Sequence, residues 1–355
     1  MGVSLMPVAV IGSRSVGKSV FVSLLANTAI SYGVKMNRHF RLYMDPQTNK
    51  VVGEMLKSLK NSMWPPATLK GTLLEYEFSF GYSNAFQRFL SGIEKILPTK
   101  IPKGELFDVI TFRLFDVAGE DVESLSKVLE DAKKRRISQA EVLSDLPATL
   151  RYTLGSDVLV FLVDASKVTV DRKDPRWNEM INTDILMAQL YSFLAQYRSL
   201  TQGGSVLYPV FVLVKFDAMD PPIMQALGVS GGDYEKWIKR LGEDRMLRWR
   251  FFEKFMSTFF RQSLSQIYGV VLRDKKMELE EAPIFVSYVA TELNEDGQYV
   301  PKVERRGLEN VIRYSESEYE AFIRYFGKIA GKISDKRISE EESYVADVGG
   351  AAGVA

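Results

Sequence analysis

A loop bounded by two glycines, close to the N-terminus, constrains this chain more than any other feature of its sequence. The loop follows an apolar run at 3–11 and leads into a segment of helical periodicity at 18–31. Its residues match the pattern Gly-x4-Gly-Lys-Ser: Gly12, Ser13, Arg14, Ser15, Val16, Gly17, Lys18 and Ser19. A strand, such a loop and a helix in this order are typical of a phosphate-binding unit.

The chemistry of the loop follows from its backbone. Glycines let the chain curl so that successive N–H groups point inward at phosphate oxygens, and the helix N-terminus adds a favourable dipole. We expect Lys18 to reach the β- and γ-phosphates and Ser19 to place its hydroxyl on Mg²⁺. Val20 completes the predicted nucleotide contacts. The alternative is a glycine-rich turn that only joins a strand to a helix.

Short apolar and β-branched runs recur along the chain and predict strands. They lie at 3–11, 73–80, 109–115, 158–163, 206–214 and 283–289. Most are apolar throughout, as strands covered by helices on both faces are. The run at 73–80 instead alternates, which is typical of a sheet edge with one side in water.

Helical periodicity separates these runs, at 18–31, 48–63, 121–135, 139–153, 178–197, 246–268 and 318–333. Strands that alternate with helices predict an α/β fold: a doubly wound, mostly parallel sheet of six strands with helices on both faces. We expect one enlarged domain over 1–337, with helical insertions near 32–66, 82–106, 120–150 and 220–280. The acidic and then glycine-rich end, 338–355, is predicted to be disordered.

Composition excludes several kinds of site. The chain has no cysteine, so disulfides, zinc–thiolate sites and cysteine nucleophiles are ruled out. Its single histidine, His39, lies in a basic polar stretch, and a Ser-His-Asp triad would have to use it. A net charge of +1 gives no polybasic signal, and we expect no nucleic-acid partner. No apolar run approaches the roughly 18 residues of a membrane span, which predicts a cytoplasmic protein.

A second short motif follows the strand predicted at 109–115. Asp116 and Gly119 form the sequence Asp-Val-Ala-Gly at its end. An aspartate in this place can hold a Mg²⁺-bound water, and the glycine N–H can meet a γ-phosphate. The alternative is a turn that carries an acidic residue.

Two further motifs follow later strands. Lys215 and Asp217 come directly after the run at 206–214, and Ser287 and Tyr288 lie in the last run. With the motifs in this order, the chain resembles the Ras-like GTPases of the translation-factor-related (TRAFAC) class of P-loop proteins.

This resemblance implies how a guanine nucleotide, GTP or GDP, would bind. Asp217 would accept hydrogen bonds from the guanine N1–H and exocyclic amine, and Lys215 would lie over the base and brace the phosphate loop. Ser287 and Tyr288 would close the base pocket. The chemistry fits, because the two acceptors of a carboxylate match the paired donors of guanine and reject adenine.

The resemblance also implies a threonine in a first switch that closes on Mg²⁺ and the γ-phosphate. Thr68 is the best candidate, since it lies between the helix predicted at 48–63 and the strand at 73–80; Thr72 is the second. The implied metal ligands are then Ser19, Thr68 and Asp116. In this scheme Lys18 neutralises developing charge, and Thr68 and Gly119 sense the γ-phosphate.

Three positions depart from the family pattern. Val214 stands where the guanine motif starts with Asn or Thr, which weakens the preference for guanine. Arg14 replaces a glycine of Ras, and it either crowds the transition state or supplies positive charge to the phosphates. Glu120 replaces the water-positioning glutamine and is a weak candidate for that role. Together these residues predict slow intrinsic hydrolysis, or hydrolysis completed by a partner.

The segment 246–268 carries aromatic residues flanked by basic ones. One interpretation is a helix packed on the sheet with its arginine stems extended along the surface. The other is a helix that contacts a membrane surface or a partner protein, which would make the protein peripheral to a membrane.

The leading hypothesis is a Mg²⁺-dependent GTPase that acts as a molecular switch with a protein effector or an activating partner. A nucleotide-binding scaffold with little turnover is the alternative from another class. A P-loop ATPase is the third, on the argument that the Lys-x-Asp match arises by chance.

Overall fold

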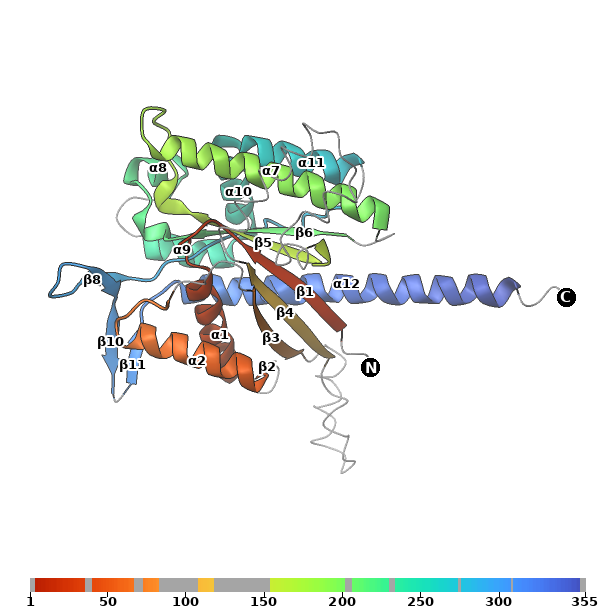
Figure 1. The fold of residues 1–355 in the computed structure, drawn as a ribbon, viewed down its shortest axis with the longest axis horizontal. Helices are drawn as coiled ribbons and strands as arrows, with labels where there is room; N and C mark the ends of the chain where they lie inside the picture. The colour runs from red at the N-terminus through yellow and green to blue at the C-terminus, as the bar shows by residue number, and fades with distance from the viewer. Residues whose placement is uncertain are drawn as a thin grey trace, which may run out of the picture.

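The computed structural model describes residues 4–35, 40–66, 73–82, 108–117, 154–201, 206–229, 234–273, 276–307 and 309–351. Seven strands within these ranges form the central sheet: β1 (Ser4–Ile11), β2 (Phe40–Met44), β3 (Leu73–Tyr82), β4 (Asp108–Val117), β5 (Val158–Asp164), β6 (Tyr208–Val214) and β7 (Ile284–Val286). Their order across the sheet is β2-β3-β4-β1-β5-β6-β7 (Figure 1).

Most neighbouring strands in this sheet are parallel. The neighbours from β4 through β1, β5 and β6 to β7 all pair in parallel, whereas β3 is antiparallel to β4 and β2 is antiparallel to β3. The predicted α/β class and the mostly parallel sheet are therefore confirmed. The count of six strands is wrong, because β2 adds a seventh at the edge; it is only five residues long and carries Arg41.

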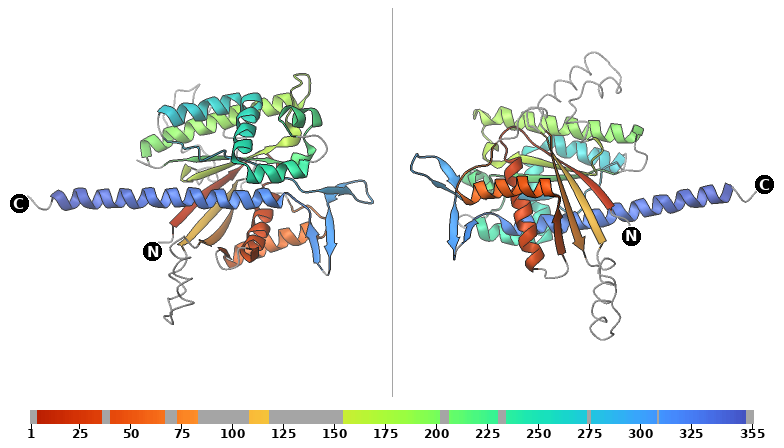
Figure 2. Two further views of the ribbon diagram at one scale, coloured as in Figure 1. Left: turned by 180° about the vertical axis from the view of Figure 1, so that it is seen from behind. Right: turned by 60° about the horizontal axis from the view of Figure 1, so that its bottom comes forward.

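Helices cover both faces of the sheet. They are α1 (Lys18–Lys35), α2 (Pro46–Lys60), α7 (Arg176–Thr201), α8 (Pro221–Ala226), α9 (Tyr234–Glu243), α10 (Arg245–Phe259), α11 (Arg261–Arg273) and α12 (Glu316–Ala351). Alternate residues of each strand serve the two faces: Ala9 packs in one core cluster with α7, α10 and α11, and Val8 in the other with α1 and α12. Figures 1 and 2 show these two layers on either side of the strands.

The segment predicted as one helix at 246–268 is two helices with a break at Phe260. The sequence has no Gly or Pro there. The break is instead set by Asp184 of α7, whose carboxylate accepts hydrogen bonds from the backbone N–H groups of Gln262 (3.0 Å) and Ser263 (2.9 Å). The aromatic side chains that suggested a membrane or partner contact are buried in the core: Phe251, Phe252, Phe255, Phe259 and Phe260.

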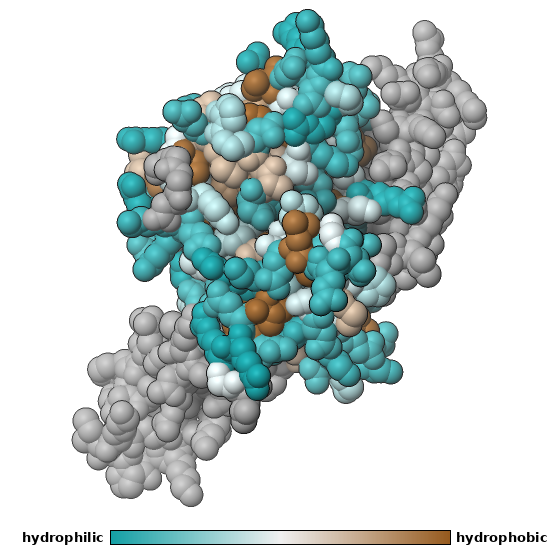
Figure 3. Space-filling model, turned by 90° about the vertical axis from the view of Figure 1, so that its left-hand side faces the viewer, coloured by the Kyte–Doolittle hydropathy of each residue, from teal (hydrophilic) through white to brown (hydrophobic). Residues whose placement is uncertain are grey.

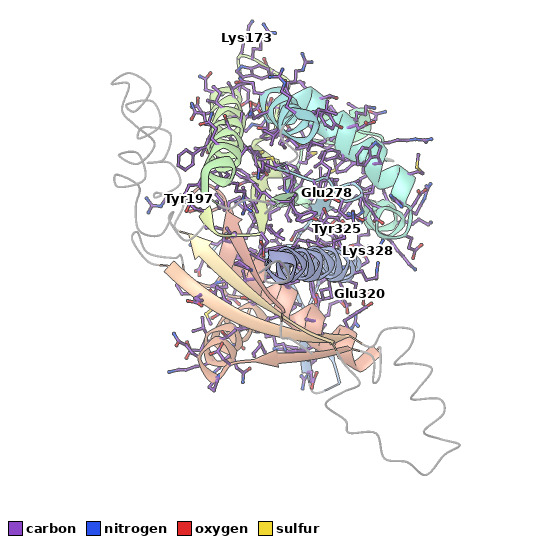
Figure 4. All side chains as sticks on the ribbon, turned by 90° about the vertical axis from the view of Figure 1, so that its right-hand side faces the viewer. Lys173, Tyr197, Glu278, Glu320, Tyr325 and Lys328 are labelled. Atoms are coloured by element: carbon purple, nitrogen blue, oxygen red, sulfur yellow. The ribbon has the colours of Figure 1, made fainter. Side chains whose placement is uncertain are left out.

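The C-terminal helix α12 is longer than predicted. A helix over 318–333 followed by a disordered tail from 338 was expected, but the helix continues to Ala351 and extends beyond the rest of the fold (Figure 2). Residues such as Glu, Ala and Lys favour helix over coil, and Gly349 and Gly350 come only at its last turn. On the sheet side, Lys332 pairs with Glu278 at 2.8 Å, and Tyr325 and Lys328 point to the same region (Figure 4).

Two short hairpins lie at one end of the molecule, next to α2. In these, β8 (Thr291–Leu293) pairs with β9 (Tyr299–Pro301), and β10 (Val303–Arg306) pairs with β11 (Glu309–Ile312). The indole N–H of Trp64 donates to the carbonyl of Tyr299 at 2.9 Å, and the amide of Asn310 donates to the carbonyl of Lys60 at 3.1 Å. The face at this end is mostly hydrophilic with separate apolar spots (Figure 3).

Several sequence predictions fall on residues that the structure does not describe. The helices predicted at 121–135 and 139–153 lie there, as do the insertion near 120–150 and almost all of the one near 82–106. Among the helices that the structure does describe, none has both the length and the apolar character that crossing a bilayer requires.

A buried ion pair joins three elements, α10, α12 and β7, at the β7 edge of the sheet. The guanidinium of Arg248 on α10 donates to the carboxylate of Glu318 on α12 at 2.5 and 2.9 Å and to the carbonyl of Ile284 on β7 at 2.6 Å. Glu318 also accepts from the N–H of Val286 at 3.1 Å. The pair therefore fixes α10 and α12 against the same strand.

We expect Arg248→Met to lower the free energy of unfolding by about 3–5 kcal/mol, because it leaves the Glu318 carboxylate charged, buried and without its cation. Urea unfolding followed by circular dichroism measures this loss. Arg313→Met is the matched control: it breaks an exposed pair with Glu235 and is expected to cost about 1 kcal/mol or less. A loss of under 1 kcal/mol for Arg248→Met would contradict the structural role of the pair.

Candidate functional site: the glycine-bounded loop and the ends of β5, β6 and β7

The glycine-bounded loop joins the end of β1 to the start of α1. Its conformation depends on both glycines. A Cβ at Gly12 would lie 2.8 Å from Cγ1 of Val16 and 3.0 Å from the carbonyl oxygen of Leu162, so only glycine fits there. Gly17 has a φ of 105°, a region that residues with side chains rarely adopt. Ser15 has a φ of 58°, which places a second strained residue in the same short turn.

Lys18 is nearly buried within this loop. Its ammonium donates to the carbonyl oxygens of Gly12 at 3.1 Å and Ser13 at 3.2 Å. The positive charge is therefore held on the inner side of the turn, next to the start of α1. This position puts one cation beside the N-terminus of a helix, and the charge and the helix dipole both favour an anion.

Asp116 lies at the same edge of the sheet. On β4 it is in register with Val10 of β1 and with Leu74 of β3, so its backbone lies beside the residues that lead into the loop. Thr68, Thr72, Gly119 and Glu120 lie outside the described residues. The structure thus brings Asp116 to the loop and leaves the two predicted switch segments undescribed.

Lys215 connects the loop to the end of β6. The residue has left-handed backbone angles (φ 54°, ψ 40°), and its ammonium donates to the carbonyl of Ser15 at 3.1 Å, across 200 positions of sequence. The same ammonium donates to Asp164 Oδ2 at 2.6 Å. Contact with the loop is what a bracing lysine requires. The partner carboxylate, Asp164, was not among the predicted site residues.

Asp217 follows in a short 3₁₀ turn, Phe216–Ala218. Burial raises the pKa of its carboxyl above the usual 3.8, and hydrogen bonds from the backbone N–H groups of Asp217 and Ala218 partly offset this. Because the pKa of this half-buried carboxyl stays raised despite these hydrogen bonds, its charged form is poorly stabilised. A ligand that donates hydrogen bonds to it would meet that need.

Two tyrosines stand near Asp217. The rings of Tyr234 on α9 and Tyr288 after β7 meet edge to face, with centroids 5.4 Å apart and planes at 79°. Burial raises the pKa of both phenols, and the negative charge of Asp217 raises each further. Tyr234 belongs to a helix that the sequence did not predict, so only Tyr288 was foreseen. Both phenols therefore lie close enough to Asp217 for its charge to act on them.

Ser287 contributes mainly through its backbone. Its N–H donates to the carbonyl of Leu213 at 2.7 Å, and its carbonyl accepts from the N–H of Phe216 at 3.0 Å. Its hydroxyl shares a hydrogen bond of 2.8 Å with the phenol of Tyr319 on α12. The side chain that was expected to close the base pocket is therefore engaged with α12, whereas the backbone joins the loop after β7 to the loop after β6.

An ion pair lies beside the tyrosines. Arg313 donates to both carboxylate oxygens of Glu235, at 2.8 and 2.9 Å, and this raises the pKa of the guanidinium. Glu235 directly follows Tyr234 at the start of α9. The pair holds that end of α9 close to the β10–β11 hairpin.

Comparison with known proteins adds little to this picture. No protein-family model and no curated protein matches the sequence. Among solved structures, a septin GTPase domain from Chlamydomonas reinhardtii aligns over 96% of this chain and 98% of that chain, with 11% identity and a TM-score of 0.33. A likeness this low carries no weight, so fold and site stand on the residues themselves.

Proposed function

We propose that this protein binds GTP and GDP with Mg²⁺ and hydrolyses GTP slowly, or with the help of a partner, as a conformational switch. One observation carries the proposal: Lys215 bonds the phosphate loop at Ser15 while Asp217, two residues later, lies half-buried beside two tyrosines. A phosphate site and a polar, aromatic-lined base site are thereby held at a fixed separation. A nucleotide is the ligand that has both parts.

The base is guanine on chemical grounds. Asp217 offers two acceptors, which match the N1–H and exocyclic amine of guanine, whereas adenine presents an acceptor at N1. Guanine would also supply the hydrogen bonds that the desolvated carboxylate lacks. Val214, at the position of the family's Asn, adds no polar contact to this recognition.

The donors near the loop fit Mg²⁺, which prefers hard oxygen ligands. Ser19 at the start of α1 offers a hydroxyl and Asp116 at the end of β4 a carboxylate, with Thr68 the proposed switch ligand. A bound Mg²⁺ would neutralise charge on the phosphates. Lys18 binds and orients those phosphates, Gly119 senses the γ-phosphate, and Glu120 is the proposed water-positioning group.

The identity of the nucleotide tests the proposal directly. Protein purified under native conditions is denatured, and the released nucleotide is identified by chromatography; GDP and ADP affinities are then measured by calorimetry on nucleotide-free protein. We expect guanine nucleotide and a GDP affinity at least about a hundredfold above that for ADP. Equal affinities would favour the ATPase interpretation and remove the role of Asp217.

Hydrolysis without a partner is expected to be slow. Arg14 is exposed in the phosphate loop, and Glu120 stands where a glutamine would orient water. The single-turnover rate with GTP should be on the order of 10⁻³ s⁻¹ or slower, as in unassisted GTPases. A burst faster than about 1 s⁻¹ would contradict this prediction.

A nucleotide-binding scaffold is the second candidate, and α12 favours it, because this helix extends beyond the rest of the fold as an available assembly surface (Figure 2). A steady-state hydrolysis rate equal to that of Lys18→Ala protein, with GTP still bound by the wild type, would select the scaffold over the switch.

A further inference from the structure

Asp164 is a buried carboxylate at the end of β5, with a side chain only 4% exposed. Its two oxygens have different partners. Oδ1 accepts hydrogen bonds from the backbone N–H of Ser166 at 3.1 Å and from the Ser166 hydroxyl at 2.5 Å. Oδ2 accepts from the ammonium of Lys215 at 2.6 Å. One oxygen therefore fixes the carboxylate, and the other acts on the lysine.

The turn that fixes Asp164 is itself held in place. Arg176, at the start of α7, donates to the carbonyl of Ser166 at 2.9 Å and to the carboxylates of Asp174 and Asp220 at 2.6 and 2.9 Å. Asp220 is the N-cap residue of α8, three positions after Asp217. The loops after β5 and β6 are thus joined at two points, by Asp164–Lys215 and by Arg176–Asp220.

The ammonium of Lys215 could pair with either of two carboxylates, Asp164 or Asp217. A lysine ammonium is a point charge on a flexible stem, and it pairs with whichever carboxylate is within reach. Asp217 is two residues away. If Lys215 paired with it, the acceptors needed by guanine would be occupied and the contact with Ser15 would be lost. The ammonium is directed to Asp164 and Ser15 instead.

We infer that Asp164 is a positioning residue: it holds the ammonium of Lys215 on the phosphate loop and so keeps the carboxylate of Asp217 available to the base. The second half of this inference, that Asp164 affects the discrimination between guanine and adenine, rests on the proposed function. The clamp itself is made only of groups of the chain: the Lys215 ammonium, the Asp164 carboxylate and the Ser15 carbonyl. The two parts are therefore tested separately.

The first test needs no nucleotide. The amine of Lys215 is labelled with acetic anhydride in nucleotide-free protein, and its rate of modification is followed by mass spectrometry. Asp164→Asn keeps an acceptor for Ser166 but removes the charge that protects the amine, so labelling should become several-fold faster. Asp184→Asn, which replaces another buried carboxylate, is the matched control and should leave the rate unchanged. An unchanged rate in Asp164→Asn would overturn the clamp.

The second test is a double-mutant cycle on GDP and ADP affinity with Asp164→Asn, Lys215→Met and the double variant. We expect Asp164→Asn to weaken GDP by about tenfold, the effect of one charge-assisted hydrogen bond, and to lower the GDP-to-ADP ratio. In the Lys215→Met background it should have no further effect, because it acts through that lysine.

The outcomes separate the two proposals. Additive losses in the cycle, or a lower melting temperature with an unchanged GDP-to-ADP ratio, would overturn the positioning role. Asp184→Asn should lower the melting temperature and leave the GDP-to-ADP ratio unchanged, since the Asp184 carboxylate holds the start of α11. If wild-type protein binds neither nucleotide, the proposed function fails, while faster labelling of Lys215 in Asp164→Asn would still establish the clamp.

Discussion

Lys18→Ala protein is expected to bind GDP and GTP about 10²- to 10³-fold more weakly than wild type. The ammonium is the one charged donor that the loop holds on its inner side, 3.1 and 3.2 Å from the carbonyls of Gly12 and Ser13. Charge-assisted bonds to two phosphates of the bound nucleotide would be lost together, each about twice as strong as a neutral one. Calorimetry with nucleotide-free protein measures the change.

The fold should survive this substitution. Lys18 is a nearly buried cation that is bonded to the carbonyl groups of Gly12 and Ser13, and its removal also removes a desolvation cost. The melting temperature of nucleotide-free protein should therefore stay within a few degrees of wild type. Lys50→Ala, an exposed lysine on α2, is the control for loss of positive charge. Wild-type GDP affinity in Lys18→Ala would remove the loop from the proposed site.

Asp217→Asn is expected to lower GDP affinity by about a hundredfold and to leave ADP affinity unchanged. The amide keeps one acceptor but loses the charge and gains a donor that opposes the exocyclic amine of guanine. The same donor suits a carbonyl at that ring position, so xanthosine diphosphate should bind the variant better than the wild type. Equal losses for GDP and ADP, with no rescue, would contradict base recognition at Asp217.

The same substitution should stabilise the protein when no nucleotide is bound. Burial raises the pKa of Asp217, so the folded chain favours the protonated form and loses stability as the pH rises from below 3.8 through the raised pKa. Asparagine does not ionise. The gain in stability of Asp217→Asn over wild type should be absent below pH 3.8 and complete above the raised pKa. Thermal melts across that pH range measure it.

The sheet could be predicted because its strands carry their own signal. The runs that became β5 and β6 are apolar at every position, and both faces are indeed buried. The hairpins β8–β9 and β10–β11 gave no such signal, since their strands have three or four residues and are largely exposed. The break between α10 and α11 was missed because it depends on Asp184, more than seventy positions earlier.

The candidate site residues also fall into two groups: those that a local sequence pattern predicts and those that depend on packing between distant segments. The loop from Gly12 and the pair Lys215 and Asp217 belong to short local patterns, from which the sequence predicts them as candidate site residues. Asp164 ends an apolar strand as a single acidic residue, a signal that is visible only once the neighbouring strand places Lys215 beside it. Tyr234 has no local signal, because its role follows from where α9 packs.

The start of α12 has consequences far from the base pocket. The N–H of Ser315 donates to the carbonyl of Tyr288, and the N–H of Tyr288 donates to the hydroxyl of Ser315. One turn later, Tyr319 is hydrogen-bonded to Ser287, so the start of the helix is bonded to the loop after β7. Thirty-six residues at 1.5 Å each make it about 54 Å long. A tilt of about 5° at its origin moves the far tip by about 5 Å. A small rotation at the contacts of α12 with Ser287 and Tyr288 is thus enlarged at the far end of the helix, which lies well outside the body of the protein (Figure 2).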